Sequence, residues 1–148
     1  MINIGHFEEE LKVLKREHEH GFLAYSDSSH AFSDVVTAHF RKVQRDDKQG
    51  VYIVRQQSTG EILYIGKGGT IDDSGHFQKQ DIPGRLKAVR GAIYSNDWFR
   101  TLVDEKGSLV IEYMFLATTP KSPALIEAVL LQAYFNEYDC LPYRNKEF

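Results

Sequence analysis

The most informative pattern in the chain is a pair of short β-branched and aromatic runs with turn residues between them. The first run covers Val51 to Val54 and the second covers Ile62 to Ile65. Ser58-Thr59-Gly60, which lies between them, is typical of a turn. Two such runs around a turn predict a β-hairpin, which would place Tyr52 and Tyr64 on neighbouring strands.

Apolar residues at helical spacing predict helices on both sides of this hairpin. Phe7, Leu11 and Leu14 recur among charged residues, so the first twenty residues are expected to form an amphipathic helix that Gly21 ends. Further on, Ile82, Leu86, Val89 and Ile93 form one apolar stripe. The other expected elements are a helix over 31–40, a polar loop over 67–80, a helix that begins at Asp81-Ile82-Pro83, a helix around 98–103 closed by Gly107, a third strand over 109–115, and a final helix from Ser122-Pro123 to about Tyr138.

The order of these elements predicts an α+β fold with a small, three-stranded, mainly antiparallel sheet flanked by helices. Residues 1–49 are expected to form a helical N-terminal extension packed on a core domain of residues 50–148. The N-terminal helix has two interpretations. It completes the core of its own chain, or it pairs with a second copy in a homodimer.

Length and composition restrict the class of protein. The chain has 148 residues, of which 42% are hydrophobic and 26% charged, so it can form a core without disulfides. Cys140 is the only cysteine, which excludes an internal disulfide and a thiolate-rich zinc site. Apolar runs such as Ala128 to Leu131 are far shorter than the roughly 20 residues of a spanning helix. Glu8, Glu9 and Glu10 do not resemble a signal peptide, so we expect a cytoplasmic protein without a membrane partner.

Charge is unevenly distributed along the chain. The net charge of −3 argues mildly against a nucleic-acid partner. Residues 66–100, however, carry more basic than acidic side chains. The basic residues of this segment are Lys67, Lys79, Arg85, Lys87, Arg90 and Arg100. On charge alone, a mixed solvated surface accounts for this excess.

Glu127 is the most informative carboxylate because its helix is apolar on nearly every side, which predicts a buried helix. The residues three and four positions away, Pro123, Ala124, Leu130 and Leu131, include no base that could pair with it. A buried carboxylate without a partner is destabilising, so it would need an arginine, a metal ion or a water-filled cleft. The alternative is that Glu127 lies at an exposed edge of the helix.

These residues, in this order, resemble the signature of the GIY-YIG nuclease superfamily. Gly50-Val51-Tyr52 and Tyr64-Ile65-Gly66 are similar to its two tripeptides, with Val in place of the middle Ile of the first. The other residues that carry the resemblance are Lys67 at a frequently basic position, Arg85 on the helix after the hairpin, Glu127 on a later helix, and Asn145 after a proline, in Pro142-Tyr143-Arg144-Asn145. The loop over 67–80 is similar to that of stand-alone, restriction-type members.

The resemblance implies a DNA endonuclease that hydrolyses phosphodiester bonds with one Mg²⁺ or Mn²⁺. By this resemblance, Glu127 would bind the metal and Arg85 would clamp a phosphate oxygen. Tyr52 would act as the general base or orient the attacking water, with Tyr64 beside it. A free tyrosine has a pKa of about 10, so the role of base needs a nearby positive charge. Lys67 or the metal ion would supply that charge, His76 is a reserve base, and Asn145 would fix the tyrosines or the C-terminal segment by hydrogen bonds. The implied DNA-binding residues are Lys67, Lys79, Arg85, Lys87 and Arg90.

Several alternatives stay open at this level. Val89 and Arg90 stand where the family often has a histidine or tyrosine, so the identity of the proton acceptor is undecided. The chain could be a catalytically inactive DNA-binding or adaptor module of the same fold. It could also be a small metabolic enzyme that binds a phosphate ligand with its glycine-rich segment 66–70. Tyr52 and Tyr64 also fit plain core packing on a hairpin.

Overall fold

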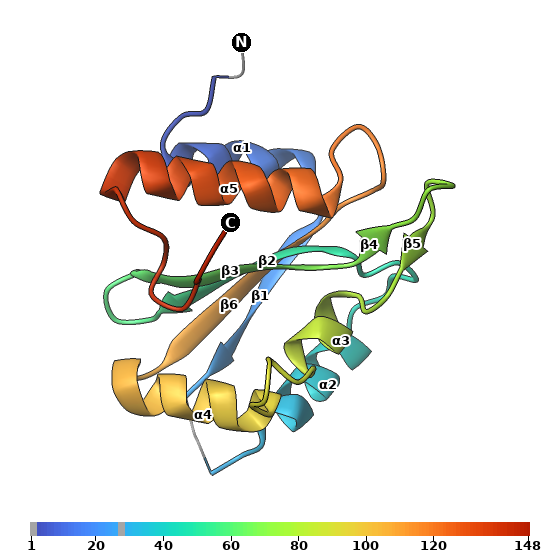
Figure 1. Ribbon diagram of the computed structural model, residues 1–148. Helices are drawn as coiled ribbons and strands as arrows, with labels where there is room; N and C mark the ends of the chain where they lie inside the picture. The colour runs from blue at the N-terminus through green and yellow to red at the C-terminus, as the bar shows by residue number, and fades with distance from the viewer. Residues whose placement is uncertain (1–2, 27–28) are drawn as a thin grey trace.

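The computed structural model, which describes residues 3–26 and 29–148, has a four-stranded antiparallel sheet between two layers of helices (Figure 1). The strand order is β1-β6-β2-β3, with β1 over His20–Tyr25, β2 over Gly50–Gln56, β3 over Ile62–Gly68 and β6 over Leu109–Phe115. Helices α1 (Phe7–Glu17) and α5 (Pro123–Tyr138) cover one face of the sheet. The other face is covered by α2 (Phe32–Arg41), α3 (Ile82–Leu86) and α4 (Ser95–Lys106). None of the helices in the described ranges is long and apolar enough to cross a bilayer.

The predicted hairpin is confirmed, and its glycine has a clear steric role. Strands β2 and β3 pair antiparallel, with Tyr52 opposite Gly66. The rings of Tyr52 and Tyr64 lie on the same face of the sheet, with centroids 6.0 Å apart. A Cβ atom at Gly66 would lie 2.5 Å from the Tyr52 ring and 2.8 Å from the Tyr64 ring. Gly66 therefore allows the two rings to approach the backbone; it does not end the strand, which continues to Gly68.

The predicted α+β class is confirmed, but the sheet has four strands and not the expected three, because the N-terminal extension contributes β1. This strand pairs with β6 over its whole length and buries Leu23 and Tyr25. Helix α1 already ends at Glu17, so Gly21 is not its stop. Gly21 lies within β1 opposite Tyr113, where a Cβ atom would be 2.5 Å from the Tyr113 hydroxyl. The extension is thus part of the sheet as well as of both helical layers.

The N-terminal helix packs within its own chain. Phe7, Leu11 and Leu14 are buried in one cluster with residues of α5, and the Phe7 ring lies 6.1 Å from the ring of Tyr134. This contact fits the interpretation in which α1 completes the core of its own chain. Helix α5 is less enclosed than its sequence predicts, because Ala124, Leu125 and Ala128 are exposed.

The helix boundaries follow the predicted caps. The Asp81 side chain accepts a hydrogen bond from the Gly84 amide at 2.9 Å, and Ser122 accepts one from Leu125 at 3.2 Å. Gly107 follows α4 with a φ of 79°, which favours glycine. These three signals predicted the starts of α3 and α5 and the end of α4 correctly.

The apolar stripe after Asp81 extends beyond the helix that forms. Helix α3 ends at Leu86, and the chain then turns between Arg90 and Ile93, whose backbones are bonded to each other, with Gly91 at a φ of 64°. Val89 and Ile93 are consequently about half exposed, at 49% and 48%. The expected loop over 67–80 is also partly regular, since β4 (Thr70–Ile71) and β5 (Phe77–Gln78) form a small hairpin beyond β3.

Candidate active site

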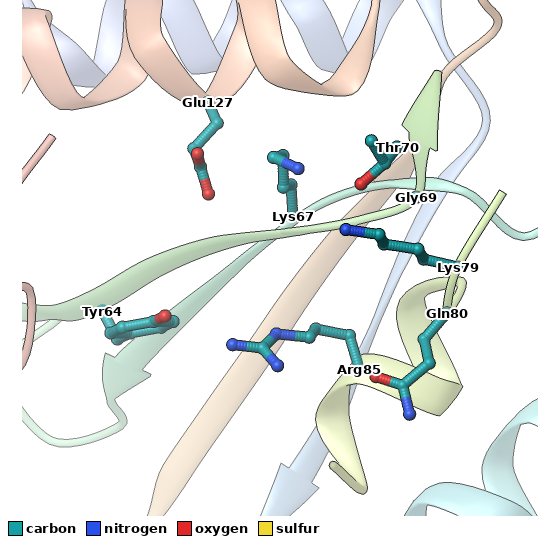
Figure 2. A pocket seen from close by; sticks show the side chains of 8 residues that line it. All are labelled: Tyr64, Lys67, Gly69, Thr70, Lys79, Gln80, Arg85 and Glu127. Carbon is teal, nitrogen blue, oxygen red and sulfur yellow. The ribbon is translucent and has the colours of Figure 1, made fainter. Parts of the chain in front are cut away.

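A pocket of about 260 Å³ lies at the outer edge of the sheet and brings together several of the polar residues that the sequence predicted for the site (Figure 2). Five of these predicted residues line it. Strand β3 supplies Tyr64 and Lys67, helix α3 supplies Arg85, helix α5 supplies Glu127, and Lys79 follows β5. The remaining lining residues are Gly69, Thr70 and Gln80.

The position of β3 explains how side chains from both helical layers reach one pocket. Side chains alternate between the two faces of a strand, so Tyr64 lies on the α3 side and Lys67 on the α5 side. Because β3 is the edge strand, Glu127 from α5 and Arg85 from α3 can meet beyond it. Figure 2 shows the Glu127 carboxylate and the Arg85 guanidinium pointing into the same space from opposite sides of β3.

The Glu127 carboxylate is held in an unfavourable state for a charged group. It is half-buried, and burial raises the pKa of its carboxyl, while the positive charges of Lys67 and Arg85 oppose this shift. Among the described residues it forms neither a hydrogen bond nor an ion pair. A desolvated carboxylate in a cleft, near cations but without direct contact to them, marks a candidate functional site.

The donor set around Glu127 restricts the kind of metal site that it could form. The described part of the chain contains no group of three or more His, Cys, Asp or Glu residues that could hold a metal ion. Mg²⁺ often binds through one or two carboxylates and completes its shell with water and substrate phosphates. Glu127 fits a site of this substrate-assisted kind and does not fit a site built from protein ligands alone.

The two tyrosines of the hairpin have different environments. Tyr64 lines the pocket, and Figure 2 shows its hydroxyl on the side of Arg85. Tyr52 is fully buried, and its hydroxyl accepts a hydrogen bond from Arg90 at 2.9 Å. Burial raises the pKa of Tyr52 to about 12, with the Arg90 charge opposing that rise. This geometry favours Tyr64 over Tyr52 as the phenol that meets a substrate.

Two predicted DNA-binding residues lie outside this pocket. Arg90 is half-buried, and its guanidinium carbon lies 4.7 Å from the Trp98 ring centroid and 5.3 Å from that of Tyr64. Lys87 is exposed, and its ammonium donates to the Thr37 hydroxyl on α2 at 3.2 Å. Both residues follow the end of α3 at Leu86, and the pocket does not include them.

His76, the reserve general base, is also outside the pocket. It is exposed between β4 and β5, and its backbone amide donates to the Asp72 side chain at 2.9 Å. The hairpin brings Lys79 to the pocket but leaves His76 out. The polar lining residues Thr70 and Gln80 were not predicted, because nothing distinguishes them from other polar residues of this segment.

Asn145 attaches the C-terminal segment to the edge of β3. Its side-chain oxygen accepts from the Ile65 amide, and its side-chain nitrogen donates to the Ile65 carbonyl, both at 2.9 Å. The Arg144 amide donates to the Leu63 carbonyl at 2.8 Å. These bonds hold the strand on both sides of Tyr64, so Asn145 acts on the site through the backbone.

We expect Asn145→Ala to lower the free energy of unfolding by about 1–3 kcal/mol, because two half-buried backbone groups of Ile65 lose their partner. Urea denaturation measures this loss. Asn136→Ala on the exposed side of α5 is the matched control and should change the stability by less than about 0.5 kcal/mol. Equal effects of the two substitutions would contradict the role assigned to Asn145.

Comparisons with models of protein families, with curated proteins and with solved structures gave no match. The function is therefore argued from the residues of the site.

Proposed function

We propose that this protein is a divalent-metal-dependent DNA endonuclease that hydrolyses phosphodiester bonds, with a site of the GIY-YIG type. The observation that carries the proposal is a desolvated carboxylate, Glu127, facing Lys67, Lys79 and Arg85 in one pocket. A carboxylate for a metal ion and cations for a phosphate are the two requirements of metal-assisted phosphodiester hydrolysis. The pairing of Tyr52 with Gly66 across the hairpin also supports the resemblance.

Each lining residue has a role that its chemistry suits. Arg85 presents a planar fork that matches two phosphate oxygens, and Lys67 and Lys79 add positive charge beside it. Tyr64 orients the attacking water or accepts its proton. A Mg²⁺ or Mn²⁺ held by Glu127 would supply Lewis-acid stabilisation of the charge that develops on the phosphate.

Cleavage of supercoiled plasmid DNA tests the proposal. We expect nicked and then linear DNA with Mg²⁺ or Mn²⁺, and intact plasmid with EDTA. An inactive DNA-binding or adaptor module would retard the plasmid in a gel without cutting it. A metabolic enzyme that uses the glycine-rich segment for a small phosphate ligand would do neither. Intact plasmid under all metal conditions would refute the nuclease proposal.

The two tyrosines provide a matched pair of substitutions. Tyr64→Phe is expected to lower the single-turnover cleavage rate by about 10²-fold, since it removes the hydroxyl that faces the substrate. Tyr52→Phe is expected to lower the free energy of unfolding by about 1 kcal/mol, because Arg90 loses a buried acceptor. Quench-flow kinetics and urea denaturation of both variants separate the two effects. A larger rate loss in Tyr52→Phe would return the proton-accepting role to Tyr52.

A further inference from the structure

A second pocket, of about 450 Å³, adjoins the candidate active site and shares Tyr64 and Arg85 with it. Its other walls come from the turn after α3, from α4 and from the C-terminal segment. The residues that these parts contribute are Arg90, Gly91, Ile93, Trp98, Arg144, Asn145, Lys146 and Glu147. We call this space the adjoining pocket.

Positive charge predominates in the adjoining pocket although the whole chain has a net charge of −3. Arg85, Arg90, Arg144 and Lys146 line it, and Glu147 is the one carboxylate that does so within the described ranges. Arg144 is paired with Glu105 at 3.0 Å. Among the described residues, Arg90, which is half-buried, and Lys146, which is exposed, have no carboxylate partner, and the Nε atom of Arg90 is buried without a hydrogen bond. A half-buried cation in this state is stabilised by an anion from outside the chain.

Aromatic packing fixes two of these cations in place. The guanidinium carbons of Arg90 and Arg144 lie 4.7 Å and 5.3 Å from the ring centroid of Trp98. Packing against a ring holds a guanidinium in place and so lowers the entropy lost when it binds a phosphate. Ile93, about half exposed, and Tyr64 add apolar and aromatic surface to the same pocket. Cations beside such surface are typical of sites for single nucleotides of a strand.

We propose that the adjoining pocket binds the nucleotide next to the phosphodiester that is cleaved. Its phosphate would contact Arg90 and Lys146, and its sugar and base would lie against Tyr64 and Ile93. The shared residues Tyr64 and Arg85 make the two pockets continuous, as neighbouring nucleotides of one strand require. This inference rests on the proposed function, because it takes the first pocket as the place of cleavage.

The test uses the single tryptophan of the chain, Trp98, as a reporter in the wall of the adjoining pocket. The full-length protein is titrated with a short DNA duplex in EDTA, and both Trp98 emission and the anisotropy of a labelled duplex are recorded. We expect quenching of Trp98 that follows the anisotropy. Lys146→Glu should weaken binding about ten-fold, and Lys146→Ala should reduce the slope of log Kd against log salt concentration by about 0.9. Lys12→Glu on α1, in the opposite helical layer, is the matched control and should bind like the parent.

Each result of these experiments decides which of the two proposals stands. DNA binding that leaves Trp98 emission unchanged, or equal weakening by Lys146→Glu and Lys12→Glu, would overturn the inference. If the parent protein cuts plasmid DNA but one of these two results is found, the nuclease proposal stands and the nucleotide-binding role of the adjoining pocket is wrong. If Lys146→Glu and Trp98 respond as expected but the parent never cuts with metal, the hydrolytic function fails and the binding site stands.

Discussion

Replacing Glu127 by glutamine is expected to lower the rate of DNA cleavage by about 10³-fold or more, which corresponds to about 4 kcal/mol of transition-state stabilisation. Glutamine has nearly the same shape as glutamate but no charge, so it cannot hold a divalent cation in the pocket. Single-turnover cleavage with Mg²⁺ measures the rate. Calorimetric titration with Mn²⁺ in the presence of DNA should show loss of metal binding in the same variant.

The same substitution should make the protein slightly more stable. Burial raises the pKa of Glu127, so the folded state binds this proton more tightly than the unfolded state does. By linkage, stability is therefore lost as the pH rises through the raised pKa, and at neutral pH the charged carboxylate destabilises the fold. We expect Glu127→Gln to raise the free energy of unfolding at neutral pH by an amount of the order of 0.5 kcal/mol. In acid, where Glu127 is protonated, the two proteins should be equally stable.

A control substitution on the same helix separates an effect on the proposed site from an effect on the fold. Glu137→Gln on α5 removes an exposed carboxylate that contacts His6 at 3.0 Å and lies outside the pocket. It should cleave DNA at the parental rate. Undiminished cleavage by Glu127→Gln would eliminate the proposed metal site, and a less stable Glu127→Gln variant would show that the carboxylate has a structural role.

Arg85→Lys is expected to lower the single-turnover rate by about 10²-fold although the charge is kept. The guanidinium fork reaches two phosphate oxygens at once, whereas an ammonium group is a single point of charge. Because this contact strengthens as charge develops on the phosphate, the rate should fall much more than the affinity for DNA. Comparing kcat with Kd from anisotropy in EDTA measures both quantities.

Arg100→Lys is the matched control for this change. Arg100 lies exposed on α4 and pairs with Asp97 at 2.8 Å, away from both pockets. It should leave rate and affinity at parental values. If the Arg85→Lys variant cleaves DNA as the parent does, Arg85 is only a surface cation and its proposed role in binding the phosphate is wrong.

Local signals predicted the parts of the fold that depend on a few neighbouring residues. The hairpin, the N-caps at Asp81 and Ser122 and the glycine after α4 are of this kind. The sequence does not reveal strand β1, because its burial depends on pairing with β6, which is distant in sequence. The length of α3 was overestimated because the apolar stripe continues after the helix ends.

The sequence predicts which residue types form the site better than it predicts how their side chains are arranged. Tyr64, Lys67, Lys79, Arg85 and Glu127 do meet in one pocket. The difference between Tyr52 and Tyr64 depends on side-chain burial, which the hairpin pattern does not contain. The packing of Arg90, a predicted DNA-binding residue, against Tyr64 and Trp98 could not be predicted because these aromatic neighbours come from separate elements. Lys146 was missed because only the docking of the C-terminal segment brings it near Tyr64.

The docking of that segment also protects the protein against aggregation. An edge strand with free backbone groups is a template for adding strands from other molecules, and Arg144 and Asn145 occupy such groups of Leu63 and Ile65 on β3. The opposite edge strand, β1, carries Phe22 with 64% of its surface exposed. Proteolytic removal of the C-terminal residues up to and including Arg144 would therefore leave backbone groups of a second edge strand, β3, unpaired. The same cleavage would remove the bonds that hold the backbone around Tyr64. A protein cleaved in this way would lose the proposed DNA-cleaving activity and would also aggregate more readily. An intact C-terminus is therefore a useful quality criterion for preparations of this protein.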